Sequence, residues 1–293
     1  MCASDSAFRD FRNTTNFKLA VFDFSRGSFR RVVLQCMPHA LLPSRATTLL
    51  IVYNDAVSDG DLYTTLVLDM DEVRRVLEAA GSERELSRRI DRISEGFLGR
   101  PYAEGLLGGG PDLPEEFRID LTAFDCVTYM ETVLALALVL KSEEFVDTIR
   151  RIRYQDGKVD WVHRNHYMID WLRNNEQDGF VKGISAGHLT VEKTCTLSII
   201  NGLPARTTTF PYFPAAALPD VAGNIETGDF VLFVSTRETL DVFHTGLLVF
   251  SNQKLLLRHA TRTAGALIEQ ELVEFMRQNT MAGFMLLRPI CRR

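Results

Sequence analysis

Apolar residues recur at helical spacing in the first half of the chain. Between residues 69 and 95 the spacing predicts one or two helices with a break at Gly81. Apolar positions over 126–141 and 142–153 predict two further helices. The intervening segment 97–118 is rich in Gly and Pro, so it is predicted to be a loop.

In the second half the pattern becomes that of strands. An apolar run at 230–234 is followed by two more over 240–250 and 253–260, with Ser251-Asn252 as the expected turn between them. A helix is expected near 268–278, and a last strand over 284–288 closes the chain. Helices followed by an antiparallel meander predict the α+β fold class.

The chain divides into two unequal parts. Residues 1–65 mix short apolar runs with turn residues and are expected to be an N-terminal extension of uncertain order, whereas 66–293 are expected to form one domain. No segment reaches the ~20 apolar residues of a membrane span. Gln35 and Pro38 interrupt the apolar run that follows Arg31, which argues against a signal peptide there.

Composition excludes some classes of protein. The chain is 46% hydrophobic and 24% charged, as is ordinary for a globular protein, and its net charge of -5 gives no reason to expect nucleic acid as a partner. Five cysteines make an odd count without C-x-x-C spacing. This argues against a disulfide framework and against a cysteine-based zinc site.

Cys126 stands where the loop ends and a long apolar helix is predicted to begin. Thr122 or Asp125 can serve as the N-cap of that helix. Unsatisfied N–H groups and the helix dipole favour a thiolate there, and can lower a cysteine pKa from ~8.5 to roughly 3.5–7.5. Cys126 is therefore a candidate nucleophile, although a buried, inert thiol is the ordinary alternative.

Two histidines of the meander supply a candidate base and its orienting partner. If Ser251-Asn252 is a two-residue hairpin loop, counting back along both strands places His244 directly opposite His259. One imidazole can then fix the tautomer of the other. Asp241 is an alternative orienting residue, and each histidine could instead be an ordinary core residue.

The segment 154–180 is polar and aromatic. His163 and His166 are spaced for zinc on a helix, with His188 or a carboxylate as a further ligand. Arg164 places a positive charge between them and no H-E-x-x-H motif occurs, so substrate recognition is the favoured interpretation. Arg164 would grip a carboxylate beside an aromatic wall containing Trp161; simple packing is the alternative.

Five short segments occur in a characteristic order. They are Phe-Leu-Gly-Arg-Pro-Tyr at 97–102, Phe-Asp-Cys-Val-Thr-Tyr-Met-Glu at 124–131, Ile-Arg-Tyr-Gln-Asp-Gly at 152–157, Arg-Asn-His-Tyr at 164–167 with Trp171, and Leu-Asp-Val-Phe-His-Thr-Gly at 240–246 followed by His259-Ala260. In this order they resemble the N-acetylmuramoyl-L-alanine amidase-like branch of the NlpC superfamily. The resemblance covers roughly residues 68–290.

The resemblance implies a papain-like, NlpC-type fold and a cysteine hydrolase. Its substrate would be the amide between N-acetylmuramic acid and L-alanine, cleaved through a thioester. Cys126 would be the nucleophile, His244 the base and His259 the orienting residue. The residues that would line the substrate cleft are Tyr102, Asp125, Arg164, Asn165, His166, Tyr167 and Asp241. No metal or organic cofactor is implied.

The resemblance also implies partners and a compartment. Peptidoglycan fragments would be the partners, in the bacterial cell envelope or periplasm, while the missing export signal leaves the cytoplasm open; the oligomeric state stays open. The resemblance leaves two alternatives open: an endopeptidase of the same fold that cuts between D-glutamate and the next residue, and a cell-wall-binding module without catalytic activity.

Overall fold

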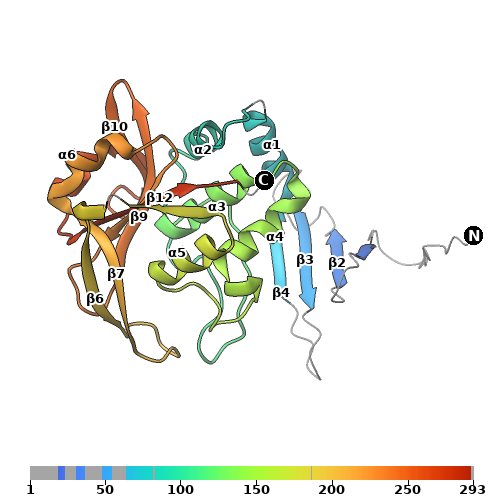
Figure 1. Cartoon of the computed structure of the whole chain (residues 1–293). Coiled ribbons are helices and arrows are strands. Elements are labelled where there is room, and N and C mark those ends of the chain that lie inside the picture. Colours follow the sequence, from blue (N-terminus) through green and yellow to red (C-terminus); the bar gives the residue numbers. More distant parts are fainter. Residues whose placement is uncertain are drawn as a thin grey trace, which may run out of the picture.

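The helices and an antiparallel sheet form two adjoining layers, as the α+β prediction requires (Figure 1). The computed structural model describes residues 19–23, 31–36, 48–54, 64–81, 83–185 and 187–291. The α-helices are α1 (Met70–Ala80), α2 (Leu86–Glu95), α3 (Cys126–Leu138), α4 (Ser142–Arg153), α5 (Met168–Gln177), α6 (Leu218–Val221) and α7 (Leu272–Gln278). The predicted helices around residues 69–95, 126–141 and 142–153 are confirmed, whereas α5 was not predicted.

The large sheet is antiparallel throughout. Its strands are β5 (Val181–Ile184), β6 (Val191–Leu197), β7 (Arg206–Pro214), β8 (Phe230–Val234), β9 (Val242–Ser251), β10 (Lys254–Thr261), β11 (Ala266–Glu271) and β12 (Gly283–Pro289). Their order is β11-β10-β9-β8-β12-β7-β6, and β5 also pairs with β12. The three apolar runs that predicted a meander are β8, β9 and β10.

Four strands near the N-terminus form a second sheet. They are β1 (Leu19–Asp23), β2 (Arg31–Cys36), β3 (Thr48–Asn54) and β4 (Thr64–Asp69), paired antiparallel in chain order. β4 leads directly into α1. The division of the chain at residue 65 into an extension and a domain stays a prediction.

The core explains why β8 is apolar at every position. Phe230 and Leu232 pack into a cluster with the helices on one side of the sheet, while Val231 and Phe233 pack into a second cluster with α7 on the other side. A strand covered on both faces has no polar side. α3 is buried along most of its length and packs against α2, α4 and β9.

The predicted helix over 268–278 is wrong in its first part. Residues 266–271 are strand β11, which pairs with β10 from Leu256↔Glu271 to Thr261↔Ala266, and only 272–278 are helical. Pairing with an exposed edge outweighs the helical spacing of the apolar residues, because tertiary context commonly overrides a local preference.

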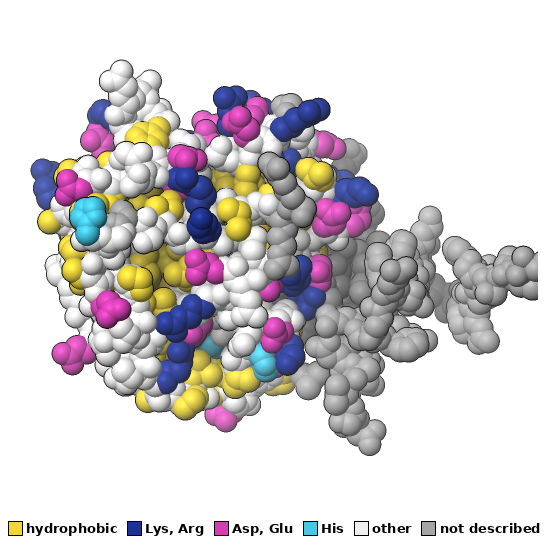
Figure 2. All heavy atoms as spheres, in the orientation of Figure 1, with side chains coloured by type: hydrophobic (Ala, Val, Ile, Leu, Met, Phe, Trp, Pro, Cys, Tyr) yellow, Lys and Arg dark blue, Asp and Glu magenta, His cyan; other side chains and the backbone are white. Residues whose placement is uncertain are grey.

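The molecular surface carries charges of both signs. Lys and Arg side chains alternate with Asp and Glu side chains over the face that Figure 2 shows, without a continuous basic area on that face. None of the helices in the described residues has the length and apolar character of a membrane span.

Candidate active site

Cys126 is the first residue of α3. The Asp125 carboxylate accepts hydrogen bonds from the N–H groups of Val127 (3.0 Å) and Thr128 (2.7 Å), and the Asp125 N–H donates to the Thr128 hydroxyl (3.0 Å). This is a capping box, so Asp125 and not Thr122 is the N-cap. The cap fixes the start of the helix and holds the sulfur of Cys126 at its N-terminal end.

The thiol of Cys126 is less accessible to water than its helix position suggested. Burial, together with the smaller effect of the Asp125 carboxylate, raises its pKa to about 12. The N–H groups of Thr245, Cys126 and Val127 act in the opposite direction but do not prevail. The predicted lowering of the pKa is therefore wrong for this structure, because desolvation outweighs the helix end.

His244 and His259 are in contact, but they are not directly opposite. Asn252 and Gln253, both at positive φ (49° and 65°), form the two-residue turn, so Phe250 pairs with Leu255 rather than with Gln253. The predicted register is wrong by two residues. A shift of two preserves the face of the sheet, and His244 Nε2 lies 2.6 Å from His259 Nδ1 across the diagonal.

A glycine makes room for this diagonal contact. A Cβ on Gly246 would lie 2.6 Å from Leu257 Cδ1, 2.8 Å from the Arg258 carbonyl oxygen and 3.1 Å from His259 Cβ. Phe275 of α7 covers both imidazoles, with its ring centre 5.3 Å from that of His244 and 5.1 Å from that of His259. Tight packing therefore fixes both rings.

The histidine pair is held in its uncharged form. Burial lowers the pKa of His244 to about 3, with a contribution from His259, and burial lowers the pKa of His259 to about 4. Neutral imidazole at His244 and neutral thiol at Cys126 are therefore the resting protonation states at neutral pH. A proton has to move from sulfur to imidazole before or during any attack by the sulfur.

Cys126 and His244 line one cavity of about 280 Å³, termed here the Cys126 cavity. The N–H of Thr245, the residue after His244, points at the Cys126 sulfur, which brings β9 and the start of α3 together. The lining residues are Leu107, Asp125, Cys126, Val127, Glu131, Arg153, Arg164, Asn165, His166, Met168, Leu240, Asp241, Val242, Phe243, His244 and Thr245. Five predicted cleft residues are among them.

Arg164 holds the wall of this cavity. Its Nη1 donates to the carbonyl oxygen of Gly108 and to Glu115 Oε1, both at 2.7 Å, and its guanidinium lies 4.5 Å from the centre of the Trp161 ring. The side chain is 11% exposed. Arg164 thus holds the Gly-rich loop in place through Nη1, which is one of its donor atoms. It also lies beside Trp161 of the predicted aromatic wall.

The neighbours of Arg164 are anchored to the backbone. Asn165 Nδ2 donates to the carbonyl oxygen of Ile152 (3.2 Å), and His166 Nε2 lies 2.7 Å from the carbonyl oxygen of Trp161. Burial lowers the pKa of His166. His163 instead bonds Asp160. In the part of the chain that the structure describes, no group of three His, Cys, Asp or Glu residues is arranged for a metal ion.

Asp241 lies in the cavity wall but is bound to backbone. Its carboxylate accepts hydrogen bonds from the N–H groups of Ile169 (2.8 Å), in the first turn of α5, and Val242 (2.7 Å). Burial raises its pKa. His259, and not Asp241, is therefore the residue that contacts His244, through the Nε2 atom of His244.

Two predicted cleft residues lie outside the lining of the cavity. Tyr167 is buried, and its hydroxyl accepts hydrogen bonds from the N–H groups of Ile199 (2.9 Å) and Ile200 (3.2 Å). Tyr102 lies near enough to Cys126 for a thiolate to raise its pKa, in addition to burial. Its hydroxyl donates to Glu104 Oε1 (3.0 Å) in an exposed hydrogen bond.

A known protein family matches more than half of the chain. The profile of the N-acetylmuramoyl-L-alanine amidase-like family matches residues 92–284, which include the start of α3 and the histidine pair. The chain belongs to the N-acetylmuramoyl-L-alanine amidase-like family. No curated protein matches the chain.

Solved structures resemble this family member over most of its length. A crystal structure named N-acetylmuramoyl-L-alanine amidase, from Bacteroides uniformis, is 26% identical with a TM-score of 0.60, and the match covers 73% of this chain and 99% of that one. A putative xylanase from Bacteroides fragilis is 26% identical, with a TM-score of 0.60 and coverage of 67% and 98%. A Legionella pneumophila protein, at 23% identity, a TM-score of 0.66 and coverage of 75% and 96%, shares the fold.

Several residues of the site in this amidase-like protein were not predicted. Glu131 and Arg153 form an ion pair of 2.7 Å in the cavity wall, each side chain 2% exposed. Burial raises the pKa of Glu131 against the effect of Arg153. One signal for this pair was present in the sequence: Glu131 stands inside a strongly apolar helix. Because a buried glutamate is rarely left unpaired, a basic partner such as Arg153, 22 residues later, could have been expected.

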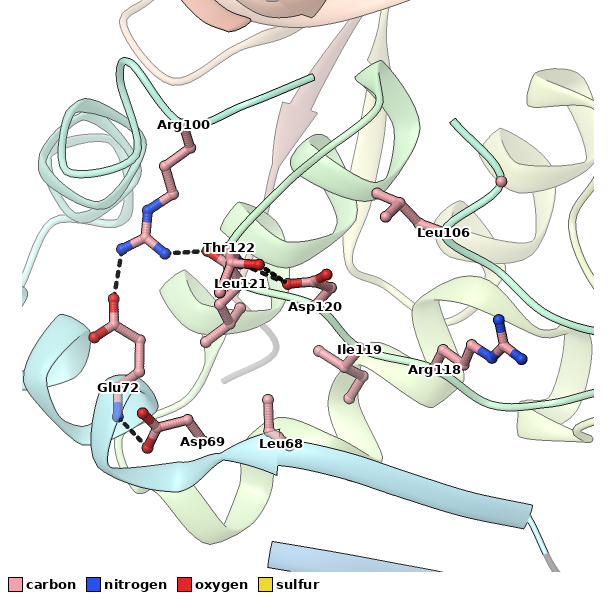
Figure 3. A pocket seen from close by; sticks show the side chains of 11 residues that line it. Leu68, Asp69, Glu72, Arg100, Leu106, Arg118, Ile119, Asp120, Leu121 and Thr122 are labelled. Carbon is pink, nitrogen blue, oxygen red and sulfur yellow. Dashed lines mark hydrogen bonds and ion pairs between the residues drawn. The ribbon is translucent and has the colours of Figure 1, made fainter. Parts of the chain in front are cut away.

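A second, larger pocket of about 690 Å³ lies between α1 and the loop around residues 105–122 (Figure 3). Its charged groups are already paired with protein. Arg100 bonds Glu72 and the carbonyl oxygen of Leu121, and Asp120 accepts from Thr122. It contains neither the cysteine nor a histidine, so the Cys126 cavity remains the candidate active site of this amidase-like protein.

Proposed function

We propose that this chain is a cysteine hydrolase that cleaves the amide between N-acetylmuramic acid and L-alanine in peptidoglycan or muropeptides. One observation carries the proposal: Cys126, at the capped start of α3, shares a small cavity with His244 of a hydrogen-bonded histidine pair. A nucleophile needs a base, and the base needs an orienting partner. Membership of the amidase-like family supports the choice of bond.

The proposed reaction begins from uncharged groups. His244 contacts His259 through Nε2, which leaves Nδ1 as the ring nitrogen for the cysteine. As the sulfur of Cys126 attacks the lactyl carbonyl of muramic acid, His244 takes the thiol proton. His244 then returns that proton to the departing amine of L-alanine. Water, activated by the same imidazole, hydrolyses the thioester and releases the sugar acid.

The oxyanion of the tetrahedral intermediate needs hydrogen-bond donors. Asp125 takes the N–H groups of Val127 and Thr128, while the N–H of Cys126 is directed at its own sulfur, next to the reacting atoms. We assign the Cys126 N–H as one donor. Tyr102 is the second candidate, and it would have to turn its hydroxyl from Glu104 toward Cys126.

The same proposal covers substrate contacts and classification. Asp125, Arg164, Asn165, His166 and Asp241 supply polar groups to the cavity wall. Arg164, whose side chain is 11% exposed, is the positive charge suited to a carboxylate of the stem peptide, whereas Arg153 is already paired with Glu131. We further propose an NlpC-type, papain-like arrangement, because a cysteine at a helix start faces a histidine on the adjoining sheet. Muropeptides would be met in the cell envelope or periplasm.

A defined muropeptide tests the proposal. The purified protein is incubated with one anhydro- and one reduced disaccharide-tripeptide, and the products are weighed by mass spectrometry. The amidase releases the intact disaccharide and a peptide that begins with L-alanine. An endopeptidase instead leaves L-alanine on the sugar and would refute the proposed bond. Unchanged substrate that is nevertheless bound would support the binding module.

A thiol reagent separates cysteine chemistry from metal chemistry. Alkylation is expected to abolish hydrolysis, whereas a chelator is expected to leave it intact. The opposite pattern would contradict the proposal. Cys291→Ala serves as the matched control, because Cys291 is exposed and lies outside the Cys126 cavity.

A further inference from the structure

A row of three hydrogen-bonding side chains runs diagonally across three neighbouring strands. His244 lies on β9, His259 on β10 and Gln270 on β11. His244 Nε2 is 2.6 Å from His259 Nδ1, and His259 Nε2 is 3.0 Å from the amide nitrogen of Gln270. Leu257 is the direct partner of Gln270 in the register, so this second contact also crosses the sheet diagonally.

The amide of Gln270 determines where the protons of the row lie. Each neutral imidazole has one N–H and one bare nitrogen. If the amide nitrogen donates to His259 Nε2, as the present contact has it, His259 donates to His244 Nε2 and the proton of His244 sits on Nδ1. Such a His244 has no lone pair at Nδ1 and cannot accept the proton of Cys126.

Rotation of the amide by half a turn reverses every hydrogen bond in the row. The oxygen of Gln270 then accepts from His259 Nε2, His259 Nδ1 accepts from His244 Nε2, and His244 Nδ1 becomes the bare nitrogen. Amide oxygen and nitrogen occupy nearly the same positions, so the rotation needs no movement of the backbone. Gln270 is only partly exposed and its contact to His259 is partly buried, which restricts competition from water.

We propose that Gln270 is a positioning residue that sets the tautomer of His244, with its amide oxygen turned to His259 in the reacting enzyme. This inference rests on the proposed function of His244 as the base for Cys126. Gln270 itself touches neither substrate nor sulfur and acts through His259.

The charged groups around the row are paired elsewhere. Arg258 of β10 bonds Glu269 of β11 and Asp91 of α2, and Glu274 of α7 pairs with Arg277. α7 presents the uncharged ring of Phe275, and β8 that of Phe233. From α3 and its N-cap residue the titratable groups at the cavity are Cys126, Glu131 and Asp125. A new charge at position 270 would therefore act mainly on the two imidazoles.

Two substitutions at position 270 test the proposal. Gln270→Met removes both hydrogen-bonding atoms at similar size, and kcat on a muropeptide is expected to fall roughly tenfold, the cost of about 1.4 kcal/mol, with KM little changed. Gln270→Glu keeps only an acceptor, so it should retain more activity than Gln270→Met. Its carboxylate should also move the acidic limb of the pH profile upward by about one unit. Gln278→Met, an exposed glutamine on α7, is the control.

A spectroscopic readout makes the outcome independent of turnover. In ¹⁵N-histidine-labelled protein at pH 7, two-bond ¹H–¹⁵N spectra report which ring nitrogen of His244 carries the proton. The proton is expected on Nε2 in the wild type and in Gln270→Glu. In Gln270→Met a mixture of the two neutral tautomers is expected, with the proton on Nε2 in some molecules and on Nδ1 in others. An identical tautomer in wild type and Gln270→Met would overturn the proposal. A wild type without hydrolysis would refute the proposed function, while this spectrum would still decide the role of Gln270.

Discussion

His244 and His259 are diagonal neighbours on adjacent strands, and their ring nitrogens lie 2.6 Å apart although the register does not place them face to face. The rings meet nearly at right angles, with an interplanar angle of 82°. This edge-on contact lets one imidazole donate or accept in the plane of the other ring. His244 lines the Cys126 cavity, and the polar row that starts from it reaches β11.

The buried histidine pair should make the fold sensitive to acid. Burial lowers the pKa of His244 to about 3 and of His259 to about 4, against ~6.5 in the unfolded chain. Below about pH 6.5 the unfolded chain therefore binds more protons at these sites. Their contribution to stability is complete above that pH and is lost progressively as the pH falls to about 3.

Urea unfolding of wild type and of His244→Phe/His259→Phe at pH 7, 6 and 5 measures this contribution. The wild type should lose more stability on acidification than the double variant. Asp241, Glu115 and Glu131 have pKa values raised by burial and act in the opposite direction, but they are present in both proteins. Parallel pH dependences would argue against the neutral pair.

Replacing His259 with phenylalanine should separate orientation from folding. His259→Phe keeps an aromatic ring against Phe275 but removes the hydrogen bond to His244. The kcat for muropeptide cleavage should fall by roughly 10²-fold, with KM little changed, because the base loses its orienting partner. His188→Phe, at an exposed position, should keep wild-type kinetics. Full activity in His259→Phe would remove His259 from the proposed mechanism.

Gly246 should not tolerate a methyl group. Gly246→Ala would place Cβ 2.8 Å from the Arg258 carbonyl oxygen, which belongs to a paired strand and cannot move freely. We expect a loss of about 1–3 kcal/mol in the free energy of unfolding, together with reduced kcat as His259 is displaced. Gly223→Ala is the matched control, because nothing lies within 4 Å of the new Cβ. Equal stability of the two variants would contradict the close packing.

Replacing only one partner of the buried ion pair of Glu131 and Arg153 should lower the free energy of unfolding strongly. Arg153→Met leaves a carboxylate buried without its partner, so thermal or urea unfolding should show a loss of about 3–5 kcal/mol. Glu131→Leu combined with Arg153→Met should recover part of this. Arg118→Met removes only an exposed pair with Glu116 and should cost less than about 1 kcal/mol. Similar losses for both arginines would show that the pair at the cavity is not desolvated.

Local patterns were sufficient for much of this fold. α4 and β8 have the bounds that their apolar spacing predicts, and Asp125 caps α3 as its position suggested. The contact between His244 and His259 was also anticipated. The two histidines are in contact although the predicted register is wrong by two residues, because side chains on a strand alternate between its faces with a period of two.

The remaining features depend on contacts between distant segments. Residues 266–271 form a strand because β10 offers them an edge, which their own spacing does not reveal. The raised pKa of Cys126 results from burial under β9, and helix position alone pointed the other way. Gln270 has no motif of its own, and only the diagonal offset between strands brings it to His259.

In the proposed reaction the sulfur of Cys126 forms a covalent bond to the substrate. Wild-type protein is mixed with a disaccharide-tripeptide, quenched in acid within one turnover and digested, and the masses of its peptides are measured. We expect the peptide that contains Cys126 to gain the mass of the disaccharide acyl group, and Cys126→Ala to show neither this adduct nor product. Product formation by Cys126→Ala at the wild-type rate would contradict the account.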